Sequence, residues 1–185
     1  VWNEDIDPKA GMLRLVFGLG TRAVDRTDDD YTRLVALNAP LKRPEARADE
    51  VREFAQRRVD VLDLKANQLV SREFELVAPA FPEGLLDLFA TRDEYIPSHA
   101  LDKDQKGAFF GVLTFGRMFA ETAFVPTMRE LCHTLQRAYN YPVDIEFTAT
   151  FLDDGPYRIN LLQCRPFQVK ASARSAEAPK RISAG

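Results

Sequence analysis

Short apolar runs, separated by prolines, glycines and charged residues, follow one another along most of the chain. Runs that are rich in β-branched and aromatic side chains and bounded by turn-forming residues are typical of β-strands. We expect strands at 12–17, 34–37, 58–64, 69–76 and 109–115, and brief helices at 45–56 and 85–89. The pattern therefore predicts an α+β fold with a largely antiparallel sheet.

One longer helix is expected at about 125–139. Apolar residues in this segment recur at helical spacing and predict a stripe that packs against a core. They are Met128, Leu131, Cys132, Leu135 and Ala138. Pro126 is compatible with the first turn, and Asn140 and Pro142 end the helix.

A β-hairpin is expected at about 143–165. Two runs in which apolar and polar residues alternate, 143–152 and 157–165, flank the segment Asp153-Asp154-Gly155-Pro156. An Asp-Gly turn between alternating runs is a strong hairpin signal. The hairpin is therefore expected to close the fold beside the helix.

Four polar residues share one face of this hairpin, Asp144 and Glu146 on the first strand and Gln163 and Arg165 on the second. If the loop has two or four residues, Asp144 lies opposite Arg165 and Glu146 opposite Gln163, with Cβ atoms about 5 Å apart. A loop of three or five residues would shift this register and separate the four groups. The other face is expected to enter the core with Ile145, Phe147, Ala149, Leu162 and Cys164.

Such a polar face suits a nucleoside triphosphate that carries magnesium. The oxygens of Asp144, Glu146 and Gln163 are hard ligands for Mg²⁺ or its waters, and the planar guanidinium of Arg165 fits a phosphate. Phosphoryl transfer requires mainly positioning and charge neutralisation, so no nucleophilic side chain is needed here. The alternative is an exposed hairpin face with one surface ion pair, which contributes about 0–1 kcal/mol.

The composition is that of a soluble globular domain, with 45% hydrophobic and 29% charged residues. A formal net charge of −3 argues against a nucleic-acid-binding surface, and no run approaches the roughly 20 apolar residues of a membrane-spanning helix. The first residues carry no secretory signal, so we expect a cytoplasmic protein with neither nucleic acid nor membrane as partner. Residues 1–168 are expected to form one domain and 169–185 a linker or disordered tail. Because the chain starts without Met, we expect it to be a piece of a longer polypeptide.

The hairpin contains Pro142-Val143-Asp144-Ile145-Glu146-Phe147 and Leu162-Gln163-Cys164-Arg165-Pro166. These two segments resemble the closing hairpin of the ATP-binding domain of the phosphoenolpyruvate synthase and pyruvate, phosphate dikinase family. Upstream, Val16-Phe17-Gly18-Leu19-Gly20 resembles the family's Gly-Leu-Gly-Glu stretch, with Thr21 in place of Glu. The resemblance covers roughly residues 8–168, and it implies an ATP-grasp-type lobe that is the second half of an ATP-binding module.

The resemblance also implies roles for individual residues. Those that would bind Mg²⁺ and ATP are Asp144, Glu146, Gln163, Arg165, Gly18 and Gly20, with Glu146 and Gln163 as metal ligands and Arg165 on a phosphate. Full enzymes of the family phosphorylate pyruvate with ATP through a phosphohistidine on a swivelling domain. The implied partners are ATP, an N-terminal ATP-grasp lobe and that swivelling domain, both absent from this chain, so the isolated segment is expected to be inactive.

Two further classes of function stay open on the sequence. One is a non-catalytic relative that binds nucleotide as a regulatory or scaffolding module, which Thr21 favours. The other is an interaction domain whose hairpin carries no ligand.

Overall fold

A computed structural model describes residues 3–24, 30–92, 111–152 and 157–167 of the chain. The strands are β1 (Met12–Leu15), β2 (Arg33–Ala36), β3 (Arg58–Asp63), β4 (Gln68–Glu73), β5 (Ala90–Arg92), β6 (Gly111–Leu113), β7 (Val143–Phe151) and β8 (Tyr157–Pro166). The helices are α1 (Thr21–Val24), α2 (Ala48–Glu53), α3 (Phe74–Val77), α4 (Glu83–Phe89), α5 (Gly116–Glu121) and α6 (Phe124–Tyr139), with 3-10 turns at Pro8–Ala10 and Ala78–Ala80. This order confirms the expected α+β class.

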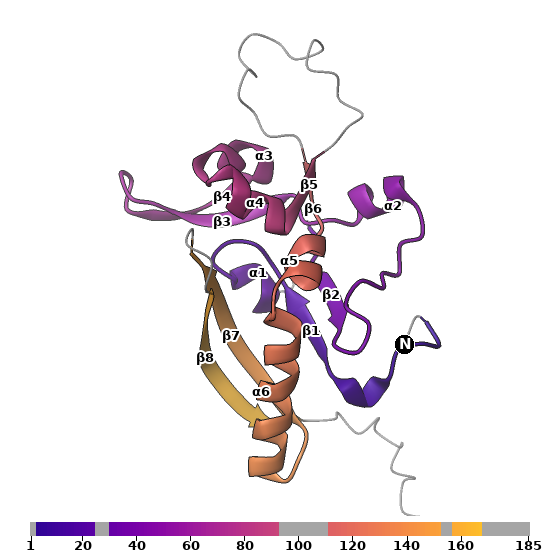
Figure 1. Ribbon diagram of the computed structural model, residues 1–185. Coiled ribbons are helices and arrows are strands. Elements are labelled where there is room, and N and C mark those ends of the chain that lie inside the picture. Colours follow the sequence, from indigo (N-terminus) through magenta and orange to yellow (C-terminus); the bar gives the residue numbers. More distant parts are fainter. Residues whose placement is uncertain (1–2, 25–29, 93–110, 153–156, 168–185) are drawn as a thin grey trace, which may run out of the picture.

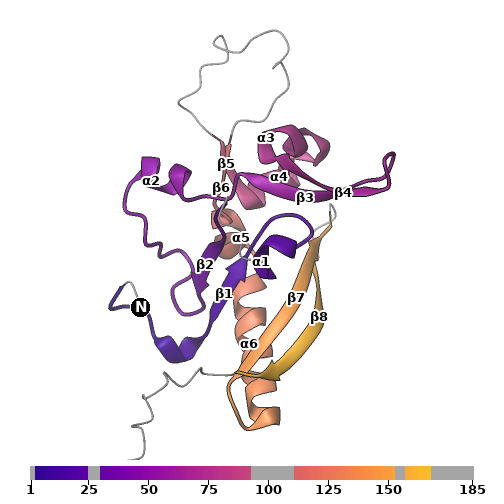
Figure 2. The ribbon, with the colours of Figure 1, turned by 180° about the vertical axis from the view of Figure 1, so that it is seen from behind.

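The strands that the structure describes pair two by two and do not form one continuous sheet. The pairs β1–β2, β3–β4, β5–β6 and β7–β8 are all antiparallel. The antiparallel pairing was therefore predicted correctly, whereas the single sheet was wrong. Helices lie between the pairs, and α5 and α6 stand between β2 on one side and β7–β8 on the other (Figures 1 and 2).

One expected strand ends early. The strand predicted at 69–76 stops at Glu73, and Phe74–Val77 forms α3 instead. Phe74 is buried in the core, where its ring lies edge-on to that of Phe17 at 5.7 Å. A helical turn brings Phe74 inward, so tertiary packing overrides the strand tendency of the segment.

Some expectations fall on parts of the chain outside the described residues. These are the turn at 153–156, the tail at 169–185, and the first two residues of the strand expected at 109–115, which lie in the region 93–110. The described flanks of this last region form β5 and β6, which pair with each other.

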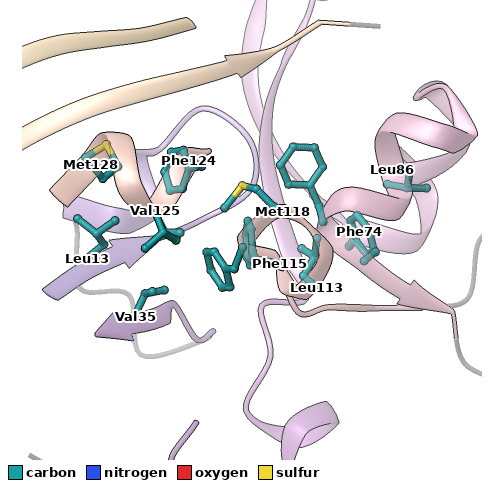
Figure 3. Packing of buried hydrophobic residues seen from close by; sticks show 14 of the residues in the cluster. Leu13, Val35, Phe74, Leu86, Leu113, Phe115, Met118, Phe124, Val125 and Met128 are labelled. Atoms are coloured by element: carbon teal, nitrogen blue, oxygen red, sulfur yellow. The ribbon is translucent and has the colours of Figure 1, made fainter. Parts of the chain in front are cut away.

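A single hydrophobic core joins the N-terminal strands to the helices (Figure 3). Its buried residues on α5 and α6 are Met118, Phe119, Phe124, Val125 and Met128. Beyond Met128 the predicted stripe of α6 is half-buried as far as Leu135, and Ala138 at its end is exposed. The stripe is thus confirmed except in the last turn, which extends past the core.

Aromatic rings connect the segment before the glycine-rich loop with the hairpin. Phe17 packs against Phe89 of α4 with ring centroids 5.3 Å apart, and Phe89 packs against Phe151 at the end of β7 at 5.1 Å. Phe151 and Tyr157 both contact Phe124 of α6 at 6.1 Å. The loop and the hairpin are therefore positioned by the same core.

The hairpin has the expected partners in the half that carries the polar face. Asp144 lies opposite Arg165 and Glu146 opposite Gln163, but the next pair along the strands is Phe147 with Leu161. The register shift leaves Leu162 as the extra residue of a β-bulge. The loop spans residues 152–156, and a five-residue loop was expected to separate the four polar groups. The bulge lies between the loop and these groups and restores the register in which they pair.

The bulge also corrects one predicted core residue. Leu162, expected on the inner face, is 64% exposed. Ile145, Phe147 and Ala149 pack against the core as predicted, together with Phe151, Tyr157 and Ile159, whereas Cys164 is only half-buried at the edge of the core.

Candidate functional site

The outer face of the hairpin brings four polar side chains together near the start of β7. Asp144 and Glu146 are half-buried, and Gln163 and Arg165 are exposed. Their two cross-strand pairs are adjacent on the same face, so directly opposite Cβ atoms lie about 5 Å apart. The four groups therefore form one surface patch, which we call the hairpin polar face.

Arg165 is held by Asp144 across the strands. Its Nε and Nη2 both donate to the Asp144 Oδ2, at 3.0 Å and 2.7 Å. Hydrogen bonding and charge attraction from Asp144 raise the pKa of Arg165, so the guanidinium stays cationic. Both side chains remain partly exposed, so solvent screens the pair and it adds little to stability, but it orients the guanidinium within the patch.

Glu146 and Gln163 face each other with their polar atoms unused. Neither side chain makes a hydrogen bond or ion pair within the ranges that the structure describes. Glu146 does attract the nearby Arg165 guanidinium electrostatically. The patch thus offers a carboxylate and an amide oxygen to a ligand, beside a fixed cation.

These donors fit a divalent cation only in part. Carboxylate and amide oxygens are the hard ligands that Mg²⁺ prefers, and Mg²⁺ commonly takes one or two protein ligands together with phosphate oxygens and water. No cluster of three or more His, Cys, Asp or Glu suited to a metal occurs among the described residues. A cation here would therefore need oxygens from a bound phosphate ligand.

The two glycines of the loop, Gly18 and Gly20, have different surroundings. Gly18 has φ +105°, and a Cβ there would lie 2.7 Å from Val59 Cγ1 and 2.8 Å from the Asp60 carbonyl oxygen. The Leu19 N–H donates to that same carbonyl at 3.1 Å, so the loop is fastened to β3. Gly20 has φ +80° with nothing within 4 Å of the Cβ position, so there is open space beside it, and its carbonyl accepts from the Ala23 N–H at 2.9 Å.

A polar network beside the loop was not found from the sequence. Asp60 of β3 accepts hydrogen bonds from Thr21 Oγ1 and from Arg22 Nε, the latter at 3.1 Å, and Arg22 Nη2 donates to Ser71 Oγ at 2.7 Å. Burial alone raises the pKa of Asp60, but hydrogen bonds from Thr21, Ser71 and Arg22 outweigh it and hold this pKa below its usual value. The alternation of Val59, Asp60 and Val61 was the one signal that placed Asp60 opposite the core side of β3.

The glycine-rich loop and the hairpin polar face lie toward different ends of the hairpin. Phe17, just before the loop, is linked through Phe89 to Phe151. Phe151 is five residues beyond Glu146 on β7, which corresponds to about 16 Å along a strand. The predicted site residues therefore form two groups, and a ligand that contacts both must extend along the hairpin.

The α+β fold and the hairpin polar face are compatible with a nucleotide-binding domain. Comparison with protein-family models gives a match over residues 3–185 to the family described as pyruvate phosphate dikinase, AMP/ATP-binding domain. The chain belongs to this family, and it carries the family's ATP-binding domain.

Other comparisons add no relative. Neither the curated proteins nor the solved structures gave a match. Within the described ranges, every helix is too short or too polar to cross a bilayer.

Proposed function

We propose that this chain binds Mg²⁺–ATP on the hairpin polar face as the ATP-binding part of a phosphoenolpyruvate synthase-like phosphotransferase. The observation that carries the proposal is the placement of Glu146 directly opposite Gln163, with unused oxygens beside the guanidinium of Arg165. Family membership supports ATP as the nucleotide.

Each residue of the face has a distinct part in this proposal. Glu146 and Gln163 hold the magnesium ion, which neutralises phosphate charge when bound. Arg165 presents its planar fork to a phosphate, and Asp144 orients Arg165 before the nucleotide arrives. A positioned cation costs less to organise at the moment of binding than a freely rotating one.

The glycine-rich loop has a supporting part. Gly20 leaves room for a ligand at its backbone, whereas Gly18 serves the packing of the loop on β3. In this arrangement the nucleotide extends along the hairpin, with its Mg²⁺-bearing part at Glu146 and Gln163.

For the whole protein we propose cytoplasmic, ATP-dependent phosphorylation of pyruvate through a phosphohistidine located outside this chain. Residues 1–168 would form an ATP-grasp-type lobe completed by an N-terminal lobe, with 169–185 as linker or tail. One observation favours a second candidate, a non-catalytic nucleotide-binding regulatory module. Thr21 replaces the acidic residue that the family places after Gly-Leu-Gly, and its hydroxyl already donates to Asp60.

Calorimetric titration of the full-length polypeptide with ATP tests the binding site. With Mg²⁺ present, Glu146→Gln is expected to weaken ATP binding at least tenfold, because a carboxylate ligand is replaced by a neutral amide. With EDTA the same substitution is expected to have a much smaller effect, since the carboxylate then repels the phosphates.

Glu130→Gln is the matched control. Glu130 is an exposed carboxylate on α6, which packs on the other face of the hairpin. Equal affinities for Glu146→Gln and the unmodified protein, with folding intact in both, would remove the assigned site. Pyruvate-dependent consumption of ATP by the full-length protein separates catalysis from regulation: tight ATP binding without it would favour the regulatory module.

A further inference from the structure

A pocket lies apart from the hairpin polar face. It encloses about 200 Å³ between β2, the Arg43–Glu45 segment, the end of α2 and β6, and none of its lining residues comes from β7 or β8. Figures 1 and 2 show β2 and α2 on one side of α5 and the hairpin on the other. This volume is far more than a single water needs, so the pocket admits a small ligand.

Arg33 lines this pocket and is buried with an incomplete set of partners. The residue is 7% exposed, and its Nη2 donates to the carbonyl oxygens of Pro40 and Lys42, at 3.1 Å and 3.2 Å. Its Nε–H is buried without an acceptor, and no carboxylate of the described residues forms an ion pair with it. Most buried polar groups are hydrogen-bonded, so this exception requires an explanation.

The positive charge around Arg33 is only partly compensated, by the Glu45 carboxylate and by the ring of Phe119. Arg43 of the same pocket pairs with Glu45, with 3.1 Å between Nε and Oε2, and both side chains are largely buried. Burial, and then repulsion from Arg43, lower the pKa of Arg33 to about 10 against a smaller opposing attraction from Glu45, so Arg33 remains protonated at neutral pH. Two guanidiniums and one carboxylate leave one net positive charge inside the pocket.

The remaining wall carries no charged side chain and includes three aromatic rings, those of Tyr31, Phe54 and Phe115. Tyr31 and Phe54 meet edge-on with ring centroids 5.2 Å apart. Gln56, the other buried polar residue here, is fully occupied, since it accepts from the Phe17 N–H and donates to the Phe17 and Arg58 carbonyls. Arg33 and Arg43 are thus the groups that a ligand would meet.

We propose that this pocket binds the phosphate group of a small metabolite, with Arg33 and Arg43 as its ligands and the Tyr31–Phe54 pair against the rest of the molecule. Guanidinium groups match the oxygens of phosphate in a planar, bidentate manner. The site is separate from the proposed nucleotide site and does not depend on it.

Thermal unfolding of the full-length protein in inorganic phosphate, at ionic strength held constant with sodium chloride, tests the proposal. Phosphate and its isostere sulfate are expected to raise the unfolding temperature with a saturable dependence, because a ligand of the native state stabilises it. Acetate tests a carboxylate at the same site, and a larger effect of acetate than of phosphate would overturn the phosphate assignment.

Variants locate the effect. Arg43→Gln is expected to raise the apparent phosphate Kd at least tenfold, whereas Arg47→Gln, at an exposed arginine of the same segment, leaves it unchanged. Arg165→Gln also leaves it unchanged if the two sites are separate. An unaltered response in Arg43→Gln, or a response lost in Arg165→Gln, would overturn the proposal.

A second readout does not depend on folding of the variants. In ¹⁵N-arginine spectra of the unmodified protein, phosphate is expected to shift the Nε–H signals of Arg33 and Arg43 along the same saturation curve. Shifts confined to other arginines would place the anion elsewhere and contradict the assignment.

Discussion

At the scale of single residues, Gly18 and Gly20 test whether the loop is shaped by packing or by a ligand. Gly18→Ala is expected to destabilise the fold by about 2–4 kcal/mol for two reasons. The added Cβ collides with the Asp60 carbonyl, and alanine is strained at the positive φ of this position. Gly20→Ala has only the backbone strain and is expected to cost about 1–2 kcal/mol. Urea denaturation measures both. A larger loss for Gly20→Ala would contradict the packing of the loop on β3.

Asp60 makes stability depend on pH in a defined direction. The pKa of Asp60 in the folded state lies below its unfolded value of about 3.9. Its contribution to the free energy of unfolding is therefore complete at pH values above about 3.9, and it is lost as the pH falls through the folded pKa. Asp60→Asn is expected to cost about 2 kcal/mol at pH 7, the scale of hydrogen bonds to a charged group. The difference from the unmodified protein is expected to shrink below about pH 4.

The matched control for Asp60 is Asp49→Asn, which removes a carboxylate whose side chain is 62% exposed. Its effect on the free energy of unfolding is expected to stay within about 0.5 kcal/mol. A gap between Asp60→Asn and the unmodified protein that is constant from pH 3 to pH 7 would show that the Asp60 charge does not stabilise the fold.

At the scale of elements, the bulge at Leu162 is expected to be dispensable for the register of the hairpin. Deleting Leu162 leaves Phe147 opposite Leu161 and Glu146 opposite Gln163, because the extra residue has no partner on β7. Leu162 is also mostly exposed, so little apolar burial is lost. Cross-strand NOEs are expected to persist, with stability reduced by about 1 kcal/mol or less.

Deleting Cys164 provides the contrasting variant. It removes a paired residue between Gln163 and Arg165, so these two can no longer share the outer face. With the bulge closed, Arg165 still lies opposite Asp144, whereas Gln163 lies opposite Ile145 with its amide toward the core. We therefore expect the Asp144–Arg165 ion pair to persist, the Glu146–Gln163 pair to be lost and stability to fall clearly. If both deletions behave alike, the bulge does not separate two registers.

The hairpin shows what local pattern can and cannot specify. Alternation placed Asp144, Glu146, Gln163 and Arg165 on one face, because side-chain direction has a period of two along a strand. The bulge was not predictable, since Leu161 and Leu162 are both apolar and the pattern gives no reason to leave either one unpaired. The five-residue loop and the one-residue bulge each shift the register by one, and the two shifts cancel, so the expected pairs form.

At the scale of the whole molecule, contacts distant in sequence decided what the pattern left open. Phe74 turns inward to reach Phe17, which ended β4 early, and Asp60 meets Thr21 and Arg22 from 39 and 38 residues away. The residues next to Phe74 and Asp60 in the sequence do not indicate which distant side chains these two contact. The sequence thus indicated the hairpin polar face but missed the groups that fix the glycine-rich loop.

The same long-range packing predicts that the loop and the hairpin unfold together. Phe89 is the ring between Phe17 and Phe151, and Phe89→Ala is expected to cost about 3–5 kcal/mol. Hydrogen exchange of the Phe89→Ala variant is expected to show β1 and β7–β8 losing protection to the same extent, because one core supports both.

Tyr157→Phe is the milder control. It removes only the 2.8 Å hydrogen bond to Thr127 and is expected to cost about 0.5–1.5 kcal/mol. Loss of protection confined to one side of Phe89 would mean that the loop and the hairpin are held independently, and that a nucleotide spanning both must order them at the moment of binding.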